Sequence, residues 1–291
     1  MSKTRSVVIT GASRGLGLAS AKHLYDEGWT VVAAMRTVDR GLAALRAATG
    51  ATEDDPRLVG VRLDLLDPDS MKQAAEDILA AVGTPYAVVH NAGIAAAGSV
   101  EELPTQLWQD MFWTHLFGPV ELTKALLPSM RAAGTGRIVM ISSAGGVRGM
   151  PVIAAYSAAK GAMERFAESL AGEVSPFGIG VSVLVTGVFD TDIITDEGTP
   201  SFRDFDGPYG RQHVSIDKRG RAAMKLANDP QKFAVALASA LEDTGPYARH
   251  WVGPDAAGLM VMAKALPTKA VHQVIRLAMG IPRHGAMREH D

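Results

Sequence analysis

The chain has 291 residues, 47% of them hydrophobic, and its formal net charge is −2. That length can bury one large α/β core, while the near-neutral charge gives no footprint for nucleic acid or a polybasic membrane contact. Cysteine is absent, which excludes disulfides and thiolate chemistry. Since we find neither a secretory signal at the start nor an apolar run long enough to span a bilayer, we expect a cytoplasmic protein.

Short β-branched runs alternate with longer helix-like stretches along most of the chain. The pattern predicts strands at residues 6–10, 30–35, 58–63, 86–90, 137–141 and 180–185. Between them it predicts helices at about 15–28, 42–48, 68–82, 107–130 and 156–173. Continuous apolar strands separated by helices are typical of a parallel sheet covered on both faces. We therefore predict an α/β fold, a single doubly wound (Rossmann-type) domain over residues 1–291 with a parallel sheet flanked by helices.

The stretch 188–230 mixes Gly, Pro, Asp and aromatic residues without a helical or strand period. Irregular insertions of this length in a compact domain are usually lids or binding loops. We expect a substrate-binding lid here, and the alternative is a mobile connection with incidental aromatic residues. Beyond it the pattern predicts a helix at 233–241, a last strand at 251–252, and a helical extension at about 256–291 that contains an amphipathic helix at 268–279.

A glycine-rich turn joins the first predicted strand to the first helix. It reads Thr10-Gly11-Ala12-Ser13-Arg14-Gly15-Leu16-Gly17. Glycines let backbone N–H groups approach a diphosphate, and the helix N-terminus favours its negative charge. Alone this is a weak signal, because tight turns also need glycine. The spacing Gly-x-x-x-Gly-x-Gly resembles the glycine motif of short-chain dehydrogenases.

The end of the second predicted strand bears on the choice of cofactor. An enzyme that prefers NAD usually places an acidic residue there, which accepts a hydrogen bond from the ribose 2′-hydroxyl. This chain has Met35 and then Arg36, and Arg14 lies in the glycine turn. Two guanidinium groups can bind a 2′-phosphate through charge-assisted hydrogen bonds, so we predict NADP(H). The alternative is that both are ordinary surface arginines.

The strongest signal is Tyr156-Ser-Ala-Ala-Lys160, in an alanine-rich helical stretch. Tyr156 and Lys160 are four residues apart, so they share one face of the helix. A phenol with a pKa of about 10 is a poor acid–base catalyst near neutral pH, and a nearby ammonium lowers that pKa. A hydroxyl is also needed to polarise the substrate oxygen, and Ser142 and Ser143 end a strand just upstream.

Tyr-x-x-x-Lys with a Ser thirteen residues before the Tyr is similar to the catalytic motif of the short-chain dehydrogenase/reductase family, and this spacing selects Ser143. The resemblance covers about residues 6–191. It implies hydride transfer between NADP(H) and a small-molecule ketone or secondary alcohol, with Tyr156 as general acid/base. Ser143 would stabilise the substrate oxygen, and Lys160 would bind the nicotinamide ribose and lower the pKa of Tyr156.

The same resemblance implies a set of cofactor contacts after the ends of the strands. They are Gly11, Ser13, Arg14, Gly15, Leu16, Gly17, Arg36, Asp64, Leu65, Asn91, Ala92, Gly93, Tyr156, Lys160, Val188 and Thr191. No metal ligand is predicted. The aromatic residues of the expected lid favour a lipophilic substrate. In the family, helices like those predicted at 107–130 and 156–173 pack between subunits, so we expect a homodimer or homotetramer.

Two positions depart from the family pattern. His115 stands where members usually carry an Asn that helps to hold a proton-relaying water, and Thr186 stands where Pro usually precedes Gly187. His115 is either an active part of the relay or a packing residue. These departures motivate a second hypothesis, a catalytically weak dinucleotide-binding sensor or scaffold protein of the same fold. The intact Ser/Tyr/Lys set argues against it, because a sensor has no need of an activated phenol.

Overall fold

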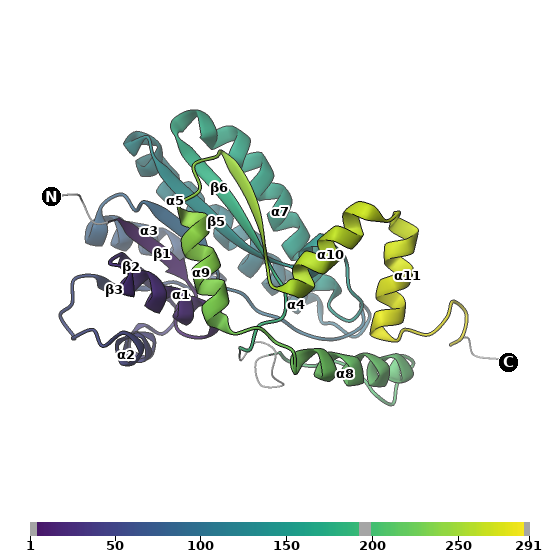
Figure 1. Ribbon diagram of the computed structural model, residues 1–291. Coiled ribbons are helices and arrows are strands. Elements are labelled where there is room, and N and C mark those ends of the chain that lie inside the picture. Colours follow the sequence, from purple (N-terminus) through teal and green to yellow (C-terminus); the bar gives the residue numbers. More distant parts are fainter. Residues whose placement is uncertain (1–4, 192–198, 288–291) are drawn as a thin grey trace.

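A sheet of seven strands forms the centre of the computed structural model, which describes residues 5–191 and 199–287 (Figure 1). The strands are β1 (Ser6–Thr10), β2 (Thr30–Met35), β3 (Leu58–Arg62), β4 (Ala87–His90), β5 (Gly136–Ser143), β6 (Ile179–Thr186) and β7 (Tyr247–Val252). All neighbouring pairs are parallel, in the order β3-β2-β1-β4-β5-β6-β7. This topology confirms the predicted doubly wound, Rossmann-type fold.

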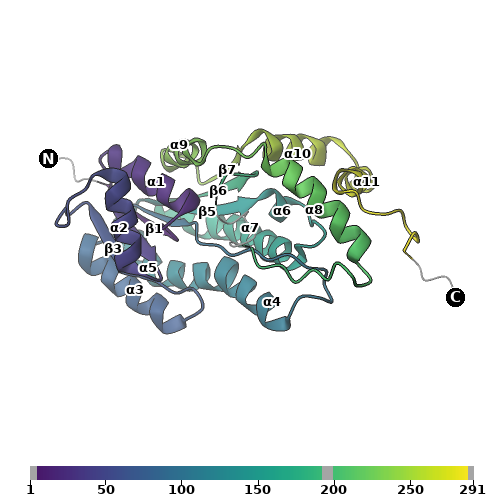
Figure 2. The same cartoon turned by 90° about the horizontal axis from the view of Figure 1, so that it is seen from below.

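Helices cover both faces of the sheet, so Figure 2 shows three layers. The helices are α1 (Gly15–Asp26), α2 (Val38–Thr49), α3 (Pro68–Val82), α4 (Thr105–Phe112), a π-helical turn η1 (Trp113–Phe117), α5 (Gly118–Ala133), α6 (Ala144–Val147), α7 (Ala154–Val174), a 3₁₀ turn η2 (Ser175–Phe177), α8 (Gly210–Met224), α9 (Pro230–Leu241), α10 (Pro254–Ala265) and α11 (Thr268–Met279). Within the described ranges, no helix is long and apolar enough to cross a membrane.

Two hydrophobic cores lie on opposite faces of the sheet, because successive strand residues point in opposite directions. On one face, Val8 of β1 packs in the same core as residues of α3, α5 and α7, such as Leu122 and Met163. On the other face, Ile9 packs in the same core as residues of α1, α2 and α9, such as Leu24 and Phe233. Burial of each large side chain stabilises the fold by roughly 1.5–3 kcal/mol before the entropic cost of ordering it.

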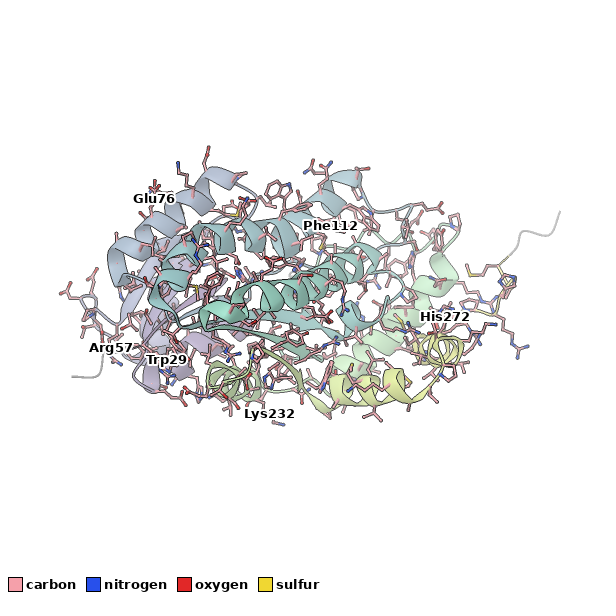
Figure 3. The ribbon with its side chains drawn as sticks, turned by 90° about the horizontal axis from the view of Figure 1, so that it is seen from above. Trp29, Arg57, Glu76, Phe112, Lys232 and His272 are labelled. Carbon is pink, nitrogen blue, oxygen red and sulfur yellow. The ribbon has the colours of Figure 1, made fainter. Side chains whose placement is uncertain are left out.

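The carboxyl ends of the strands open toward one end of the molecule. Figure 3 places Trp29 and Arg57, which precede β2 and β3, at the opposite end from His272 of α11. Helices α8, α10 and α11 lie beyond the carboxyl ends (Figure 1). The strand order changes direction between β1 and β4. Ligands of open parallel sheets bind at such a switch point.

The stretch 188–230 differs from its prediction, because it is not irregular throughout. It contains the fifteen-residue helix α8, and residues 192–198 lie outside the described residues. Helix α8 is mostly polar and buries little more than His213 and Ile216, which are three residues apart. With such a narrow apolar stripe, the sequence carries no clear helical period.

Other element boundaries differ from the prediction for local reasons. Helix α2 begins at Val38, not at 42, because the polar pair Asp39 and Arg40 and the poor helix former Gly41 hide its first turn in the sequence. Strand β7 begins at Tyr247, four residues before the predicted start, because Arg249 and His250 of this edge strand interrupt the apolar run. The predicted helix at 107–130 is two α-helices joined by the π-helical turn η1. Helix α10 begins at Pro254, just before the predicted extension.

Candidate active site

Thr10 and Asn91 join the turn after β1 to the turn after β4. The Oγ1 of Thr10 accepts hydrogen bonds from the backbone N–H groups of Asn91 and Ala92, both at 3.0 Å. The side-chain amide of Asn91 donates to the carbonyl of Thr10 at 2.9 Å. Gly11 has φ of +69°, and a Cβ on it would lie 2.8 Å from the Cα of Ala92. Only glycine fits this close approach of two backbones.

The predicted phosphate-binding turn is equally tight. A Cβ on Gly17 would lie 2.7 Å from the side-chain nitrogen of Asn91, and Gly15 has φ of +54°. The N-cap residue of α1, Arg14, makes no side-chain capping hydrogen bond. A cradle of glycine backbone at this helix N-terminus fits the diphosphate of a dinucleotide. A Cβ on Gly15 would lie 3.3 Å from the Cβ of Thr191, so Thr191 lies against this turn.

At the end of β2, Met35 is buried and its thioether packs against Gly41 of α2. A Cβ on Gly41 would also lie 3.2 Å from the Cβ of Ser13, so the glycine turn, the end of β2 and the start of α2 meet here. Arg14 and Arg36 are both exposed. The strand therefore ends with an apolar side chain directed inward and a guanidinium at the surface.

The remaining predicted cofactor positions lie in turns at the same end of the sheet. Asp64 forms a tight turn in which its Oδ1 accepts from the N–H of Leu66 at 3.1 Å. Leu65 is buried, and a Cβ on Gly118 would lie 3.0 Å from its Cβ. The N–H of Val188 donates to the carboxylate of Asp255 at 2.7 Å, which fixes the turn after β6 to the start of α10. Leu16 is half-buried against the core that contains Ile9.

Ser143, Tyr156 and Lys160 meet at the carboxyl end of β5. Ser143 is the last residue of β5 and caps α6, because its Oγ accepts from the N–H of Gly145 at 3.2 Å. Its side chain also hydrogen-bonds that of Tyr156, in the first turn of α7. Lys160 lies one turn further along α7, with its Nζ 5.8 Å from the centroid of the Tyr156 ring. The Lys160 Nζ donates to the carbonyl of Ile141 at 2.6 Å.

The electrostatics of this cluster differ from the prediction that Lys160 lowers the pKa of Tyr156. Burial raises the pKa of Tyr156, and the hydrogen bond from Ser143 opposes that shift only in part. Burial also lowers the pKa of Lys160 to about 7, while the carboxylate of Glu164 acts in the opposite direction. Lys160 is therefore only partly charged near neutral pH and contacts the Ile141 carbonyl. The structure keeps Tyr156 in its protonated form.

His115 is buried in the π-helical turn η1, and it is 1% exposed. Its Nε2 donates to the carbonyl of Ile94 at 2.8 Å, so Nδ1 carries the lone pair in this tautomer. Within the described residues Nδ1 has no hydrogen-bond partner. The imidazole meets the ring of Tyr156 edge to face, with centroids 5.3 Å apart, and a Cβ on Gly93 would lie 2.9 Å from its Cε1. Burial, and then the charge on Lys160, lower the pKa of His115 well below its usual value.

Sequence reasoning missed a buried ionic cluster behind the Ser/Tyr/Lys set. Glu164 is 2% exposed, and its carboxylate contacts Ser142 of β5 and Arg249 of β7. The signal that was available is the i, i+4 spacing of Glu164 from Lys160. No single sequence pattern could place Arg249 beside it, since β6 separates β5 from β7. Across the two described ranges, no group of three His, Cys, Asp or Glu residues is placed to hold a metal ion.

Known proteins resemble this chain over most of its length. The family model described as short chain dehydrogenase matches residues 5–200. A 3-ketodihydrosphingosine reductase from Bacteroides thetaiotaomicron is 30% identical over 280 residues, 94% of this chain and 98% of that protein. The dehydrogenase/reductase SDR family member 7B from Mus musculus is 33% identical over 227 residues, 77% of this chain and 68% of that protein.

A solved structure agrees with these relatives. The crystal structure of a short-chain dehydrogenase from Streptomyces avermitilis matches with a TM-score of 0.78 and 33% identity, and the match covers 97% of this chain and 100% of that one. The residues matched by the family model include the glycine turn, the Asn-Ala-Gly turn and the Ser/Tyr/Lys set. This chain therefore belongs to the short-chain dehydrogenase family, oxidoreductases that bind a nicotinamide dinucleotide.

Proposed function

We propose that this protein is an NADP(H)-dependent reductase or dehydrogenase that acts on a lipophilic ketone or secondary alcohol. The observation that carries the proposal is the meeting of Ser143, Tyr156 and Lys160 at the carboxyl end of β5. The glycine turn after β1 lies at the same end of the sheet, so a dinucleotide bound there would reach the three side chains. When bound, the nicotinamide supplies or accepts the hydride.

The chain's own residues handle the proton and the developing charge. Tyr156 has a raised pKa, so at neutral pH it is a phenol that can donate a proton to the oxygen of a ketone. Ser143 would donate a hydrogen bond to the same oxygen and stabilise its negative charge as hydride arrives. Lys160, once turned toward a bound ribose, would hold it and favour the phenolate that proton donation leaves. This arrangement favours reduction near neutral pH.

The preference for NADP(H) rests on the end of β2. Met35 is turned inward and no carboxylate follows it directly, while Arg36 and Arg14 are exposed at the surface. A 2′-phosphate there would meet guanidinium groups, whereas a free 2′-hydroxyl would lack an acidic acceptor from the strand end.

The proposed lipophilic substrate is supported by a relative and by the lid segment. The relative from Bacteroides thetaiotaomicron, which this chain matches over 94% of its length, is a 3-ketodihydrosphingosine reductase. In this chain the N–H of Phe202 donates to the carbonyl of Ala97 at 2.7 Å, which attaches the segment after residue 198 to the loop after β4. Phe202 and Phe205 remain partly exposed on that segment. We propose that the described parts of the lid segment, 188–191 and 199–230, cover the substrate and that residues 256–287 border it.

A binding assay followed by a turnover assay tests this proposal. Titrating the purified protein with NADPH and with NADH, by nicotinamide fluorescence, should show tighter binding of NADPH. Oxidation of NADPH should then depend on added ketone, and long-chain ketones should react faster than short ones at equal concentration. Tighter binding of NADH would refute the cofactor choice, and faster reaction of short polar ketones would refute the substrate class.

The second candidate function is a dinucleotide-binding sensor or scaffold with weak catalysis. It is favoured by the burial of His115, which replaces the usual Asn. The variant Tyr156→Phe separates the two functions. In an enzyme it should bind NADPH normally and lose at least about 1,000-fold in kcat, whereas Tyr25→Phe, on α1, should keep both properties. NADPH binding without turnover in the unmodified protein, on a broad ketone panel, would favour the sensor.

A homodimer or homotetramer and a cytoplasmic location stay predictions of the sequence. Light scattering coupled to size-exclusion chromatography would measure the mass of the assembly directly. A monomer at micromolar concentration would contradict the first prediction, and recovery of the protein in a membrane or secreted fraction would contradict the second.

A further inference from the structure

Glu164 is a buried carboxylate one helical turn beyond Lys160. Tyr156, Lys160 and Glu164 are spaced four residues apart along α7, so their side chains follow one face of the helix. Glu164 is 2% exposed and Lys160 is 4% exposed. A buried carboxylate is costly unless it is paired and hydrogen-bonded, so its position behind the Ser/Tyr/Lys set calls for a function.

The carboxylate of Glu164 ties α7 to the strand that carries Ser143. Its Oε1 accepts from the Oγ of Ser142 at 2.5 Å, and Ser142 directly precedes Ser143. Lys160 makes the neighbouring link, because its Nζ donates to the carbonyl of Ile141 at 2.6 Å. Two adjacent turns of α7 are therefore held to two consecutive residues of β5, Ile141 and Ser142.

Helix α6 closes over the same point. A Cβ on Gly146 would lie 2.7 Å from the Oγ of Ser142, 3.0 Å from the Cβ of Lys160 and 3.1 Å from the Oε1 of Glu164. Helix α7, the end of β5 and helix α6 thus meet at Gly146 without room for a methyl group. Movement of Glu164 would be transmitted to all three.

Arg249 of β7 completes the cluster from the other side. Its Nη2 donates to Oε2 of Glu164, and its guanidinium lies 4.6 Å from the centroid of the Trp251 ring. Arg249 is half-buried and Glu164 is fully buried, so the pair is screened from water on the side of Lys160. The carboxylate of Glu164 therefore pairs with Arg249 and also acts electrostatically on Lys160.

We propose that Glu164 is a positioning residue for Lys160: its carboxylate supplies the counter-charge for the buried ammonium and fixes α7 to the strand that ends in Ser143. The proposal rests on the proposed function, in which Lys160 acts as a cation beside Tyr156. Arg249 competes for the same carboxylate and so weakens its effect on Lys160. Removing Glu164 and removing Arg249 should therefore change the charge state of Lys160 in opposite directions.

The charged and titratable groups that face Lys160 determine whether its pKa should rise or fall in each variant. They are Tyr156 and Glu164 from α7, His115 from η1, and, through Glu164, Arg249 from β7 and Arg165 from the next position of α7. Glu164 raises the pKa of Lys160, against the lowering by burial. Loss of the carboxylate lowers that pKa further, so the ammonium loses its proton at lower pH. Loss of Arg249 removes a positive charge and has the opposite effect.

The test compares Glu164→Gln, Arg249→Met and the control Glu173→Gln. Glu173 is exposed near the end of α7. For each purified protein, kcat/KM for ketone reduction and the dissociation constant for NADPH are measured from pH 6 to pH 10. Circular dichroism and thermal unfolding establish that each variant is folded.

We expect the basic limb of kcat/KM to move to lower pH by on the order of one pH unit in Glu164→Gln. NADPH binding should weaken at a correspondingly lower pH. The limb should move to higher pH in Arg249→Met and stay in place in Glu173→Gln. A shift of both cluster variants in the same direction, or of neither, would overturn the proposal, because a merely structural pair loses the same contact whichever partner is removed.

Two further arms keep the outcome decisive. If Glu164→Gln does not fold, Glu164→Asp, which keeps the charge, and Arg249→Met decide the matter. The basic limb of kcat/KM must then stay at the same pH in Glu164→Asp and move to higher pH in Arg249→Met. Any other result overturns the proposal. If the unmodified protein binds NADPH but shows no turnover, the proposed function fails, whereas the pH dependence of NADPH binding in the variants still tests Glu164 by itself.

Discussion

His115 offers the sharpest test of how this site differs from the usual family pattern. We predict that its imidazole stays neutral at neutral pH, because burial lowers its pKa well below the usual value, and that it serves to hold the ring of Tyr156. The variant His115→Ala removes the hydrogen bond to Ile94, the edge contact with Tyr156, and the bulk of a buried ring. Together these losses should lower the free energy of unfolding by about 3 kcal/mol.

The variant His115→Phe separates packing from chemistry. It keeps a ring against Tyr156 and removes both nitrogens, so it should cost about 1 kcal/mol for the lost hydrogen bond to Ile94. Urea denaturation at pH 7 measures the stability of each variant, and steady-state kinetics from pH 5.5 to pH 9 measures its activity. Because burial holds the pKa of His115 well below its usual value, both limbs of the pH profile should be unchanged in His115→Phe.

A specific result would refute this reasoning. If the unmodified protein shows an acidic limb between pH 6 and pH 7 that is missing in His115→Phe, the imidazole titrates during turnover. A fall in kcat of more than about 100-fold, with stability retained, would likewise place His115 in the proton relay and not in the packing around Tyr156.

Two further predictions concern other parts of the fold. Arg36→Asp should weaken NADPH binding by about 10- to 100-fold, which corresponds to the loss of one charge-assisted hydrogen bond. It should leave NADH binding equal or tighter. Unchanged selectivity between the two cofactors in parallel fluorescence titrations would exclude Arg36 as a phosphate ligand. His90 is buried, its Nε2 pairs with the Oγ1 of Thr123 at 2.9 Å, and burial lowers its pKa to about 3. Since the unfolded chain takes up this proton near pH 6.5 and the folded protein does not, stability is lost as the pH falls from about 7 toward 3. This group alone should lower the free energy of unfolding by about 2 kcal/mol between pH 7 and pH 5. Chemical denaturation of the unmodified protein and His90→Gln at both pH values measures the difference, and an equal loss in the two proteins would rule out His90 as its source.

The fold was predictable because its strands are continuous apolar runs. Val7, Val8 and Ile9 are all fully buried, and a strand with both faces buried must lie inside a parallel sheet with two helical layers. Helix α8 was not predictable, since it packs through His213 and Ile216 and is mostly polar elsewhere. His213 pairs with Glu102, in the loop after β4, at 2.9 Å. Because that partner lies in another part of the chain, the local sequence of α8 shows no helical period that would predict the contact.

The site, like the fold, has parts that the sequence predicts and parts that it does not. Tyr156 and Lys160 were predictable because their spacing on one helix is a local property, and Ser143 followed from its distance along the chain to Tyr156. The orientation of Lys160 toward Ile141 and the sign of the pKa shift of Tyr156 depend on burial by other elements. The pairing of Glu164 with Arg249 depends on strand order, which brings residues 85 positions apart into contact.

The π-helical turn η1 has a consequence for anyone who alters this region. A π turn holds one more residue than an α turn, so it rotates everything that follows by about 100° around the helix axis. The sixteen residues of α5, with Leu122 and Leu126 directed into the core, keep that orientation only while the extra residue is present. A one-residue deletion between 113 and 117 would therefore change far more than a loop. It would turn the apolar face of α5 toward solvent, so alignments and loop-trimming designs must treat Trp113–Phe117 as a fixed spacer of five residues.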